Sequence, residues 1–382
     1  MSEKAASPAN APSGSPAPAA RSAFWQKEWV NTLGRFAALV AIFVFFALMV
    51  EQGNFYKARN LEAILRQSAV YATAALGMTL VVIAGGIDLS IGSVIALTMV
   101  MVAWILDIEY QAIPPGGGEA VTVELISQWP RMLPLFAVAG AVVAATLAGL
   151  ANGLMIVRFR VVPFIVTLGT MGIFRGLAKG VANEKDIYPP DTWITDIMQP
   201  TVTKWWSWAT GSGEQAPKLE GFEWLILPLG VWILLASAAA AAFLLRYTRL
   251  GRHIYAIGSS EETARLCGVP VARTKVVVYM LAGFFGGLAG LMEFSFVNGY
   301  GQPSAAVGYE LFIIAAVVIG GGSLSGGEGS ILGSLIGALM ITILYMGGRQ
   351  IGLKEWHQQI AIGAIIIGAV ALDQLRHRRV SY

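Results

Sequence analysis

The sequence predicts an all-α integral membrane protein with about ten transmembrane helices. Of its 382 residues, 56% are hydrophobic and 13% are charged, against roughly 25% charged in an average soluble domain. The apolar residues form long runs, and the 44 glycines suit helices that pack closely in lipid. The single cysteine, Cys267, excludes an internal disulfide and a zinc cluster.

Ten hydrophobic segments are expected to form a membrane domain over residues 34–375. Some are shorter than the roughly 20 residues of a straight crossing, and the segment near 309–322 is short enough either to cross or to re-enter. The segments are 34–51, 64–84, 91–107, 133–156, 161–180, 223–245, 274–293, 309–322, 329–347 and 357–373.

Both ends of the chain are expected to be tails. Residues 1–33 begin with a stretch rich in Ala, Pro and Ser, which is typical of disorder. Phe24, Trp25 and Trp29 then predict an interfacial approach to the bilayer. A charged segment followed by an apolar one is missing there, so no cleaved signal is expected. Residues 376–382 form the second tail.

The distribution of Lys and Arg predicts that both termini are cytoplasmic. Cytoplasmic positions then include Arg158, Arg160 and the segment 246–275, which is rich in arginine. The opposite side receives the acidic segments near 107–124 and 184–196. The external loop 181–222 also carries tryptophans, for which an aromatic belt at the interface is favoured over a partner surface or a sugar-stacking platform. These are Trp193, Trp205, Trp206 and Trp208.

Two apolar segments are interrupted by similar polar sequences. Residues 85–92 read GGIDLSIG and residues 320–327 read GGGSLSGG, which match at both leading glycines, at the Leu-Ser pair and at the last glycine. A carboxylate such as Asp88 costs about 3 kcal/mol or more in hydrocarbon unless it is paired or faces water. Two interrupted segments of similar chemistry indicate a transport pathway.

Three roles are open for Asp88. It can cap the following helix, as Ser90 also can, because Asp and Ser are preferred at helix N-termini. It can instead contact a polyol substrate or carry a proton. Capping is favoured, and a proton relay is disfavoured because only one deep carboxylate is evident, with Glu293 and Glu310 expected to be solvated.

Polar residues in or beside the apolar segments are the candidates for lining a pathway, although hydrogen bonding between helices is their commoner role. The candidates are Asp88, Ser90, Asn152, Thr167, Thr170, Asn298, Ser323 and Ser325. The three histidines are isolated and no HExxH motif occurs. We therefore expect no enzymatic activity, no metal, no cofactor and no nucleic-acid partner.

Residues 258–270, GSSEETARLCGVP, predict a short capped helix between two membrane segments. Ser259 and Glu262 have the spacing of a capping box. Gly268 can supply a left-handed C-terminal cap, and Pro270 prevents continuation. Such a helix either transmits force to a cytosolic partner or merely connects two segments, and local signals favour neither.

Residues 324–328 read LSGGE, close to a nucleotide-binding signature, but the chain lacks the GxxxxGK[ST] loop that binds phosphates. We therefore interpret these glycines as a packing feature. If hydrolysis powers this protein, it belongs to another subunit.

Four collinear motifs resemble the permease subunits of ABC monosaccharide importers, especially the ribose and xylose permeases. They are GMTLVVIAGGIDLSIGSVIAL (77–97), ANGLMIVRFRVVPFIVTLGTMGIFRG (151–176), GRHIYAIGSSEETARLCGVPVARTK (251–275) and VIGGGSLSGGEGSILGSLIGAL (318–339). The resemblance runs from about 60 to 375 and implies an ABC importer permease fold. The insertion near 185–222 and the long N-terminal tail depart from the ribose-type pattern.

The resemblance implies a bacterial inner-membrane importer that works with a cytosolic ABC ATPase and a periplasmic or lipid-anchored sugar-binding protein. A second permease copy, expected as a homodimer, would complete it. The capped segment would be the coupling helix on the ATPase, with Ser259, Glu262, Ala264, Leu266, Cys267 and Gly268 as its residues. An ion-coupled secondary transporter of a small polar solute is the alternative.

Overall fold

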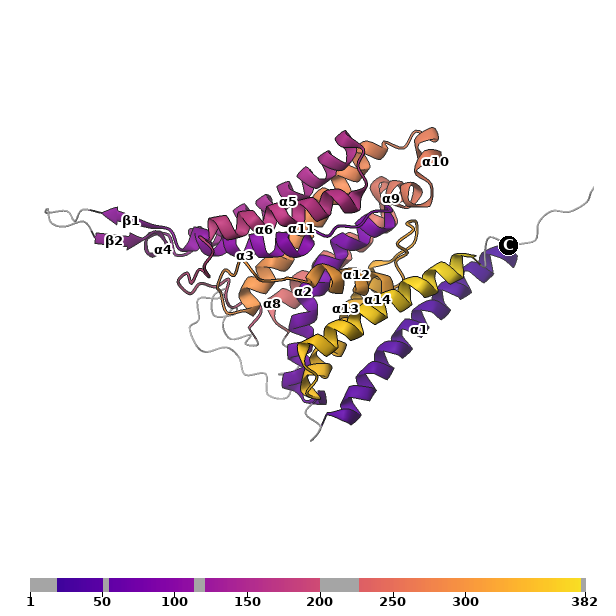
Figure 1. Ribbon diagram of the computed structural model, residues 1–382, viewed down its shortest axis with the longest axis horizontal. Coiled ribbons are helices and arrows are strands. Elements are labelled where there is room, and N and C mark those ends of the chain that lie inside the picture. The colour runs from indigo at the N-terminus through magenta and orange to yellow at the C-terminus, as the bar shows by residue number, and fades with distance from the viewer. Residues whose placement is uncertain (1–18, 51–54, 113–120, 200–226, 379–382) are drawn as a thin grey trace, which may run out of the picture.

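The computed structural model describes residues 19–50, 55–112, 121–199 and 227–378, and within them the chain forms a helical bundle with one β-hairpin (Figure 1). Helices that match the ten expected segments are α1 (Ala19–Met49), α2 (Ala58–Ile83), α3 (Ile91–Leu106), α5 (Met132–Phe159), α6 (Pro163–Val181), α8 (Leu229–Tyr247), α11 (Val271–Phe296), α12 (Tyr309–Ile319), α13 (Ile331–Gln350) and α14 (Glu355–Arg378). The short helices are α4 (Leu125–Gln128), α9 (Arg249–Ser259) and α10 (Glu261–Leu266).

Seven of these helices are long and apolar enough to cross a membrane: α1, α2, α5, α6, α8, α11 and α13. Helices α3 and α12 are apolar but shorter, with 16 and 11 residues. A helical membrane protein is therefore confirmed, while ten crossings stay a prediction.

Helix α2 lies at the centre of the bundle. In its most apolar stretch 94% of the residues are buried, against 6% in the corresponding stretch of α1. It packs against α8, α11, α12 and α13, and α11 also packs along α5. The contact between α5 and α11 needs glycine, because a β-carbon on Gly149 would lie 3.0 Å from the Gly283 Cα. Small residues thus bring these backbones together, as in other membrane bundles.

The structure departs from the expected elements at two places. Strands β1 (Glu109–Ala112) and β2 (Val121–Glu124) form an antiparallel hairpin in a chain expected to be all-α. Its signal was the sequence PPGGG between two short β-prone runs, which is typical of a hairpin. Helix α1 begins at Ala19, inside the segment expected to be a tail and an interfacial approach. Three tryptophans of the external loop, Trp205, Trp206 and Trp208, lie outside the described residues.

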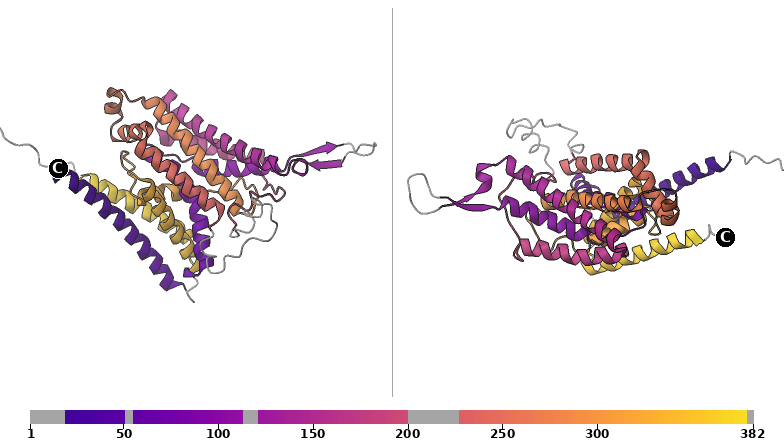
Figure 2. Two further views of the ribbon diagram at one scale, coloured as in Figure 1. Left: turned by 180° about the vertical axis from the view of Figure 1, so that it is seen from behind. Right: turned by 90° about the horizontal axis from the view of Figure 1, so that it is seen from above.

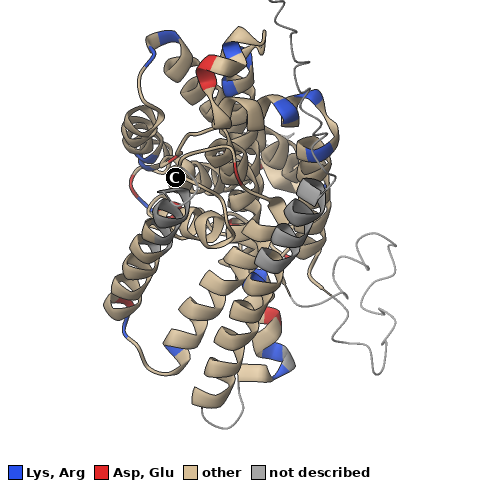
Figure 3. Cartoon of the chain, turned by 90° about the vertical axis from the view of Figure 1, so that its right-hand side faces the viewer, with Lys and Arg blue, Asp and Glu red and all other residues tan. Residues whose placement is uncertain are grey.

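The two ends of the bundle differ. Helices α9 and α10 lie at one end, and the hairpin extends from the other, as the views in Figure 2 agree. The end with α9 and α10 faces the viewer in Figure 3, and basic residues of four helices belong to it: Arg158 and Arg160 at the end of α5, Arg252 of α9, Arg265 of α10 and Lys275 of α11. We call the end with α9 and α10 the basic end.

Candidate functional site

The first break, residues 84–90, joins α2 to α3 and begins with a Schellman motif. The Gly86 amide donates to the Val81 carbonyl at 2.9 Å, and the Gly85 amide donates to the Val82 carbonyl at 2.9 Å. Gly85 has a φ of +77°, which glycine adopts readily. The last carbonyls of α2 are therefore paired although the helix stops inside the protein.

Four of the predicted pathway residues meet at the first break. Asp88 is 2% exposed, and its Oδ1 accepts from the Ser90 amide at 2.9 Å and from the Ser90 hydroxyl at 2.6 Å. The Ser90 hydroxyl accepts from Asn152 Nδ2 of α5 at 2.8 Å. The Thr167 hydroxyl of α6 donates to the Ile87 carbonyl at 3.2 Å. The break is thus tied to two neighbouring helices.

Capping was the favoured role for Asp88, but neither Asp88 nor Ser90 makes a side-chain cap bond to α3. The carboxylate closes a two-residue turn ahead of α3 by accepting the amide of Ser90, the residue that precedes the helix. It does not reach an amide within α3. The other two roles, substrate contact and proton carriage, stay predictions.

The second break, residues 320–330, joins α12 to α13 and repeats this design. Gly321, with a φ of +86°, donates to the Val318 carbonyl at 2.8 Å, and a second bond from the next amide completes a Schellman motif. The Ser325 amide then donates to the Ser323 hydroxyl at 3.3 Å, as the Ser90 amide does to Asp88. The left-handed glycine stands one residue closer to this turn than in the first break.

The two breaks contact each other at the basic end. The Gly327 amide donates to the carbonyl of Ile83, the last residue of α2, at 2.9 Å. A β-carbon on Gly326 would lie 3.0 Å from the Gly85 Cα. The hydroxyls of Thr79 and Ser334 lie 2.7 Å apart and join α2 to α13 nearby. The repeated motifs therefore form one site.

Besides Ser93 Oγ in the first turn of α3, two buried polar atoms near the first break have no hydrogen-bond partner in the part of the chain that the structure describes. They are Asn152 Oδ1 and Tyr279 Oη. Tyr279 lies against the break, since a β-carbon on Gly86 would come within 2.5 Å of its hydroxyl. Unpaired buried polar groups are costly, so a hydrogen-bonding group brought beside these two atoms would stabilise them.

Two predicted pathway residues lie apart from the hydrogen-bonded network at the breaks. Thr170 is buried and donates to the Thr167 carbonyl within α6 at 3.3 Å. Asn298 follows α11 at the end opposite to the breaks, in the left-handed conformation with a φ of +66°, and accepts from Gln199 at 2.9 Å. Its role is to shape a turn at that end.

The expectation that Glu293 is solvated was wrong. This residue of α11 is 4% exposed, and its Oε1 accepts from the Tyr309 hydroxyl at 2.9 Å. Its Oε2 has no partner among the described residues. Among the described residues two carboxylates are therefore buried, and counting only Asp88 was an error. The missed signal is helical spacing, because Glu293 follows the buried Gly286 and Gly290 on the same face of α11.

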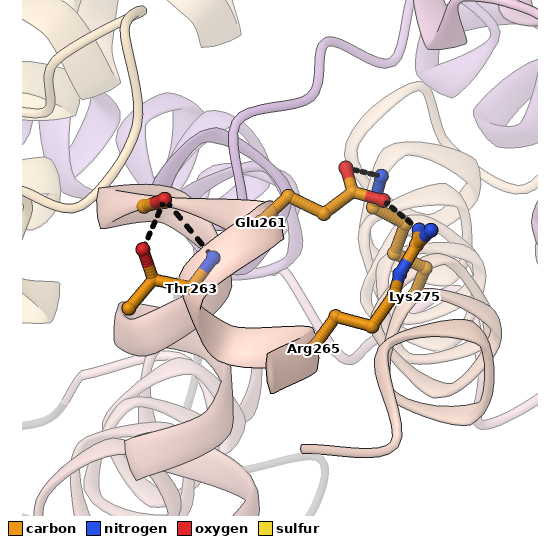
Figure 4. A network of polar contacts seen from close by, with 5 residues as sticks. Glu261, Thr263, Arg265 and Lys275 are labelled. Atoms are coloured by element: carbon orange, nitrogen blue, oxygen red, sulfur yellow. Dashed lines mark hydrogen bonds and ion pairs between the residues drawn. The ribbon is translucent and has the colours of Figure 1, made fainter. Parts of the chain in front are cut away.

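The predicted capping box of Ser259 and Glu262 is not formed, and a single N-cap lies one residue later. The N-cap of α10 is Ser260, whose hydroxyl accepts from the Thr263 amide at 3.2 Å (Figure 4). Ser259 ends α9 and donates to the Tyr255 carbonyl at 3.0 Å. The reason is that the chain becomes extended at Ser260, with a φ of −164°, so the helix restarts one residue later. Glu262 is exposed and takes no part in the cap.

The predicted C-terminal cap of α10 is present. The Gly268 amide donates to the Arg265 carbonyl at 3.1 Å, and the Val269 amide donates to the Ala264 carbonyl at 3.0 Å, which is a Schellman motif. Ala264 is buried and cannot be a docking side chain. Leu266, by contrast, is 89% exposed, and Cys267 beside it is also exposed.

Glu261 ties α10 to α11. Its carboxylate pairs with Lys275 at 2.6 Å and with Arg265 at 3.1 Å (Figure 4). The hydrogen bond from Lys275 lowers the pKa of Glu261, with Arg265 adding to the effect. The carboxylate therefore stays ionised, and this tie is lost only as the pH falls through a pKa below the ordinary value of 4.5.

Seven membrane-length helices, together with two mutually contacting breaks of repeated design, define a polytopic membrane transport protein. A family described as "Branched-chain amino acid transport system / permease component" matches residues 60–370, and the chain belongs to this family. No solved structure matches the chain.

Its relatives include sugar permeases. The ribose import permease protein RbsC of Escherichia coli (strain K12) is 35% identical over 351 residues, which cover 92% of this chain and 96% of the relative. The xylose transport system permease protein XylH of the same strain is 33% identical, covering 90% and 91%. The RbsC of Bacillus subtilis (strain 168) is 34% identical, covering 90% and 93%.

We predict that Ser90→Ala destabilises the protein by about 1–3 kcal/mol, because it removes a partner from both the Asp88 carboxylate and the Asn152 amide. Thermal unfolding in detergent measures the effect. Ser325→Ala is the matched control, because that turn uses the backbone amide of Ser325. Equal melting temperatures for Ser90→Ala and the wild type would contradict the network.

Proposed function

We propose that this protein is the membrane-spanning permease subunit of an ATP-driven importer of monosaccharides. Support comes from the family, from relatives named as ribose and xylose permeases, and from two repeated breaks in contact. The contact between the breaks is the observation that carries the proposal. Two apolar segments are interrupted, and their interruptions lie side by side in the bundle. Two copies of the chain would enclose the pathway, and a separate ATPase would supply the energy.

Transport would proceed by alternating access. A sugar-binding protein would release its cargo at the end that carries the hairpin, and the ATPase would act at the basic end. A contact made equally in both states shifts no equilibrium, so the breaks must have different contacts in the outward-facing and inward-facing states. The unpaired atoms Asn152 Oδ1 and Tyr279 Oη are suited to the hydroxyls of a polyol.

An ion-coupled secondary transporter is the second candidate. The buried carboxylate of Glu293, with one unpaired oxygen, favours it, because proton pathways in membranes use such groups.

The orientation proposed here has both termini and the basic end in the cytoplasm. We expect Cys267, the single cysteine and an exposed one, to react with a membrane-impermeant maleimide only in inside-out vesicles or permeabilised cells. Labelling is read by a mass shift on gels, with a Cys267→Ser variant as the blank. Equal labelling of intact cells would reverse the orientation.

Energy coupling separates the two candidates. We expect liposomes that contain this protein, its ATPase and its binding protein to accumulate labelled ribose or xylose only with internal ATP, because the nucleotide would drive the cycle. The protein alone should accumulate neither sugar. Accumulation by the protein alone, abolished when the ion gradient is dissipated, would establish the secondary transporter instead.

We propose that the exposed Leu266 side chain docks on the ATPase. We predict that Leu266→Asp weakens binding of the ATPase by at least about tenfold, because an apolar anchor at the centre of an interface is replaced by a charge. Co-purification in detergent measures binding. Val307→Asp changes an exposed apolar residue near the opposite end, in the loop before α12, and serves as the control. Wild-type binding by Leu266→Asp would remove α10 as the docking element.

A further inference from the structure

Helix α9 is in direct backbone contact with both breaks. A β-carbon on Gly258, in the last turn of α9, would overlap the Ile83 carbonyl oxygen and the Gly327 amide nitrogen. These two atoms are the partners in the hydrogen bond that joins the end of α2 to the second break. Gly258 therefore sits on the bond between the breaks, with no side chain in between.

The second break approaches α9 in return. A β-carbon on Gly326 would lie 2.7 Å from the Gly258 carbonyl oxygen, and one on Gly327 would lie 2.9 Å from the Ser259 hydroxyl. The Tyr255 hydroxyl of α9 donates to the Gly329 carbonyl at 2.8 Å. The backbones of α2, α9 and the second break thus meet at glycines. The Tyr255 hydroxyl joins α9 to the second break.

This junction continues into α10. One extended residue, Ser260, separates the end of α9 from the start of α10, and the pair Glu261–Lys275 attaches α10 to α11. Lys275 also lines a small cavity with Gly85 and Gly86 of the first break. A displacement of α10 therefore reaches the breaks through short, packed connections. Packed interiors of low compressibility transmit such displacements, and they switch between discrete arrangements.

We infer that Gly258 is the positioning residue through which α9 and α10 move the two breaks together. Contact between backbones leaves no rotamer freedom to absorb the movement. A side chain at this position would separate α9 from the hydrogen bond between Ile83 and Gly327. The inference rests on the proposed function, because it takes α10 as the part of the chain that the ATPase moves.

The test compares transport with hydrolysis in complexes of the full chain, the ATPase and the binding protein, with labelled ribose and xylose as probes. We expect Gly258→Ala to lower the sugar taken up per ATP hydrolysed by about tenfold, while the ATPase stays bound. Tyr255→Phe removes only the hydroxyl that donates to the Gly329 carbonyl. It should also lower the sugar taken up per ATP hydrolysed, but by less than Gly258→Ala does. Gly172→Ala is the control, since a β-carbon there meets nothing within 4 Å.

A wild-type ratio for Gly258→Ala would overturn the inference. If that variant does not assemble, Tyr255→Phe decides, and a wild-type ratio for it overturns the inference as well. Uptake by the wild-type complex separates this outcome from failure of the proposed function. A wild-type complex that transports neither sugar with ATP contradicts the function, whereas normal variants of a transporting complex contradict only the role of Gly258.

Discussion

The structure depends on pairing the backbone groups that become free where a helix stops inside a membrane domain. Hydrocarbon offers no hydrogen bonds, so irregular backbone is tolerated only where protein surrounds it. Both breaks meet this requirement in the same way, with a left-handed glycine that closes the preceding helix and a side-chain oxygen that closes the following turn. The bond from Gly327 to Ile83 then pairs one break with the other. Asp88 lies inside the protein because its carboxylate accepts the Ser90 amide and so closes the turn of the first break.

Two groups of buried polar residues lie far apart along α11. Asp88, Ser90, Asn152 and Tyr279 gather beside the breaks at the basic end, while Glu293 and its tyrosine lie toward the other end. Tyr279 and Glu293 are 14 residues apart on α11, about 21 Å at 1.5 Å per residue. Between them α11 is apolar and packed closely through its glycines, so the two groups are separate.

Sequence alone predicted a helix at each of the ten apolar segments and the similarity of the two breaks, because hydrophobic runs and glycine pairs are local patterns. It did not predict α9, which is not an apolar run. It placed Asp88, Ser90, Asn152 and Thr167 among the candidates but could not bring them together, since their proximity depends on the packing of α3, α5 and α6. The cap at Ser260 was missed because only Ser259, with Glu262 three residues later, has the spacing of a capping box, whereas the extended backbone makes Ser260 the N-cap. The contact at Gly258 joins segments far apart in the chain, and a single sequence carries no signal for it.

The brevity of α12 has a consequence for the depth of the barrier. Its 11 residues rise about 16 Å, roughly half of the 30 Å hydrocarbon layer. The preceding residues 297–308 include left-handed Gly299 and Gly308 and the polar Asn298. Helix α12 by itself therefore cannot seal the hydrocarbon layer, and the helices packed around it, α2, α3 and α13, must complete the insulation at this place.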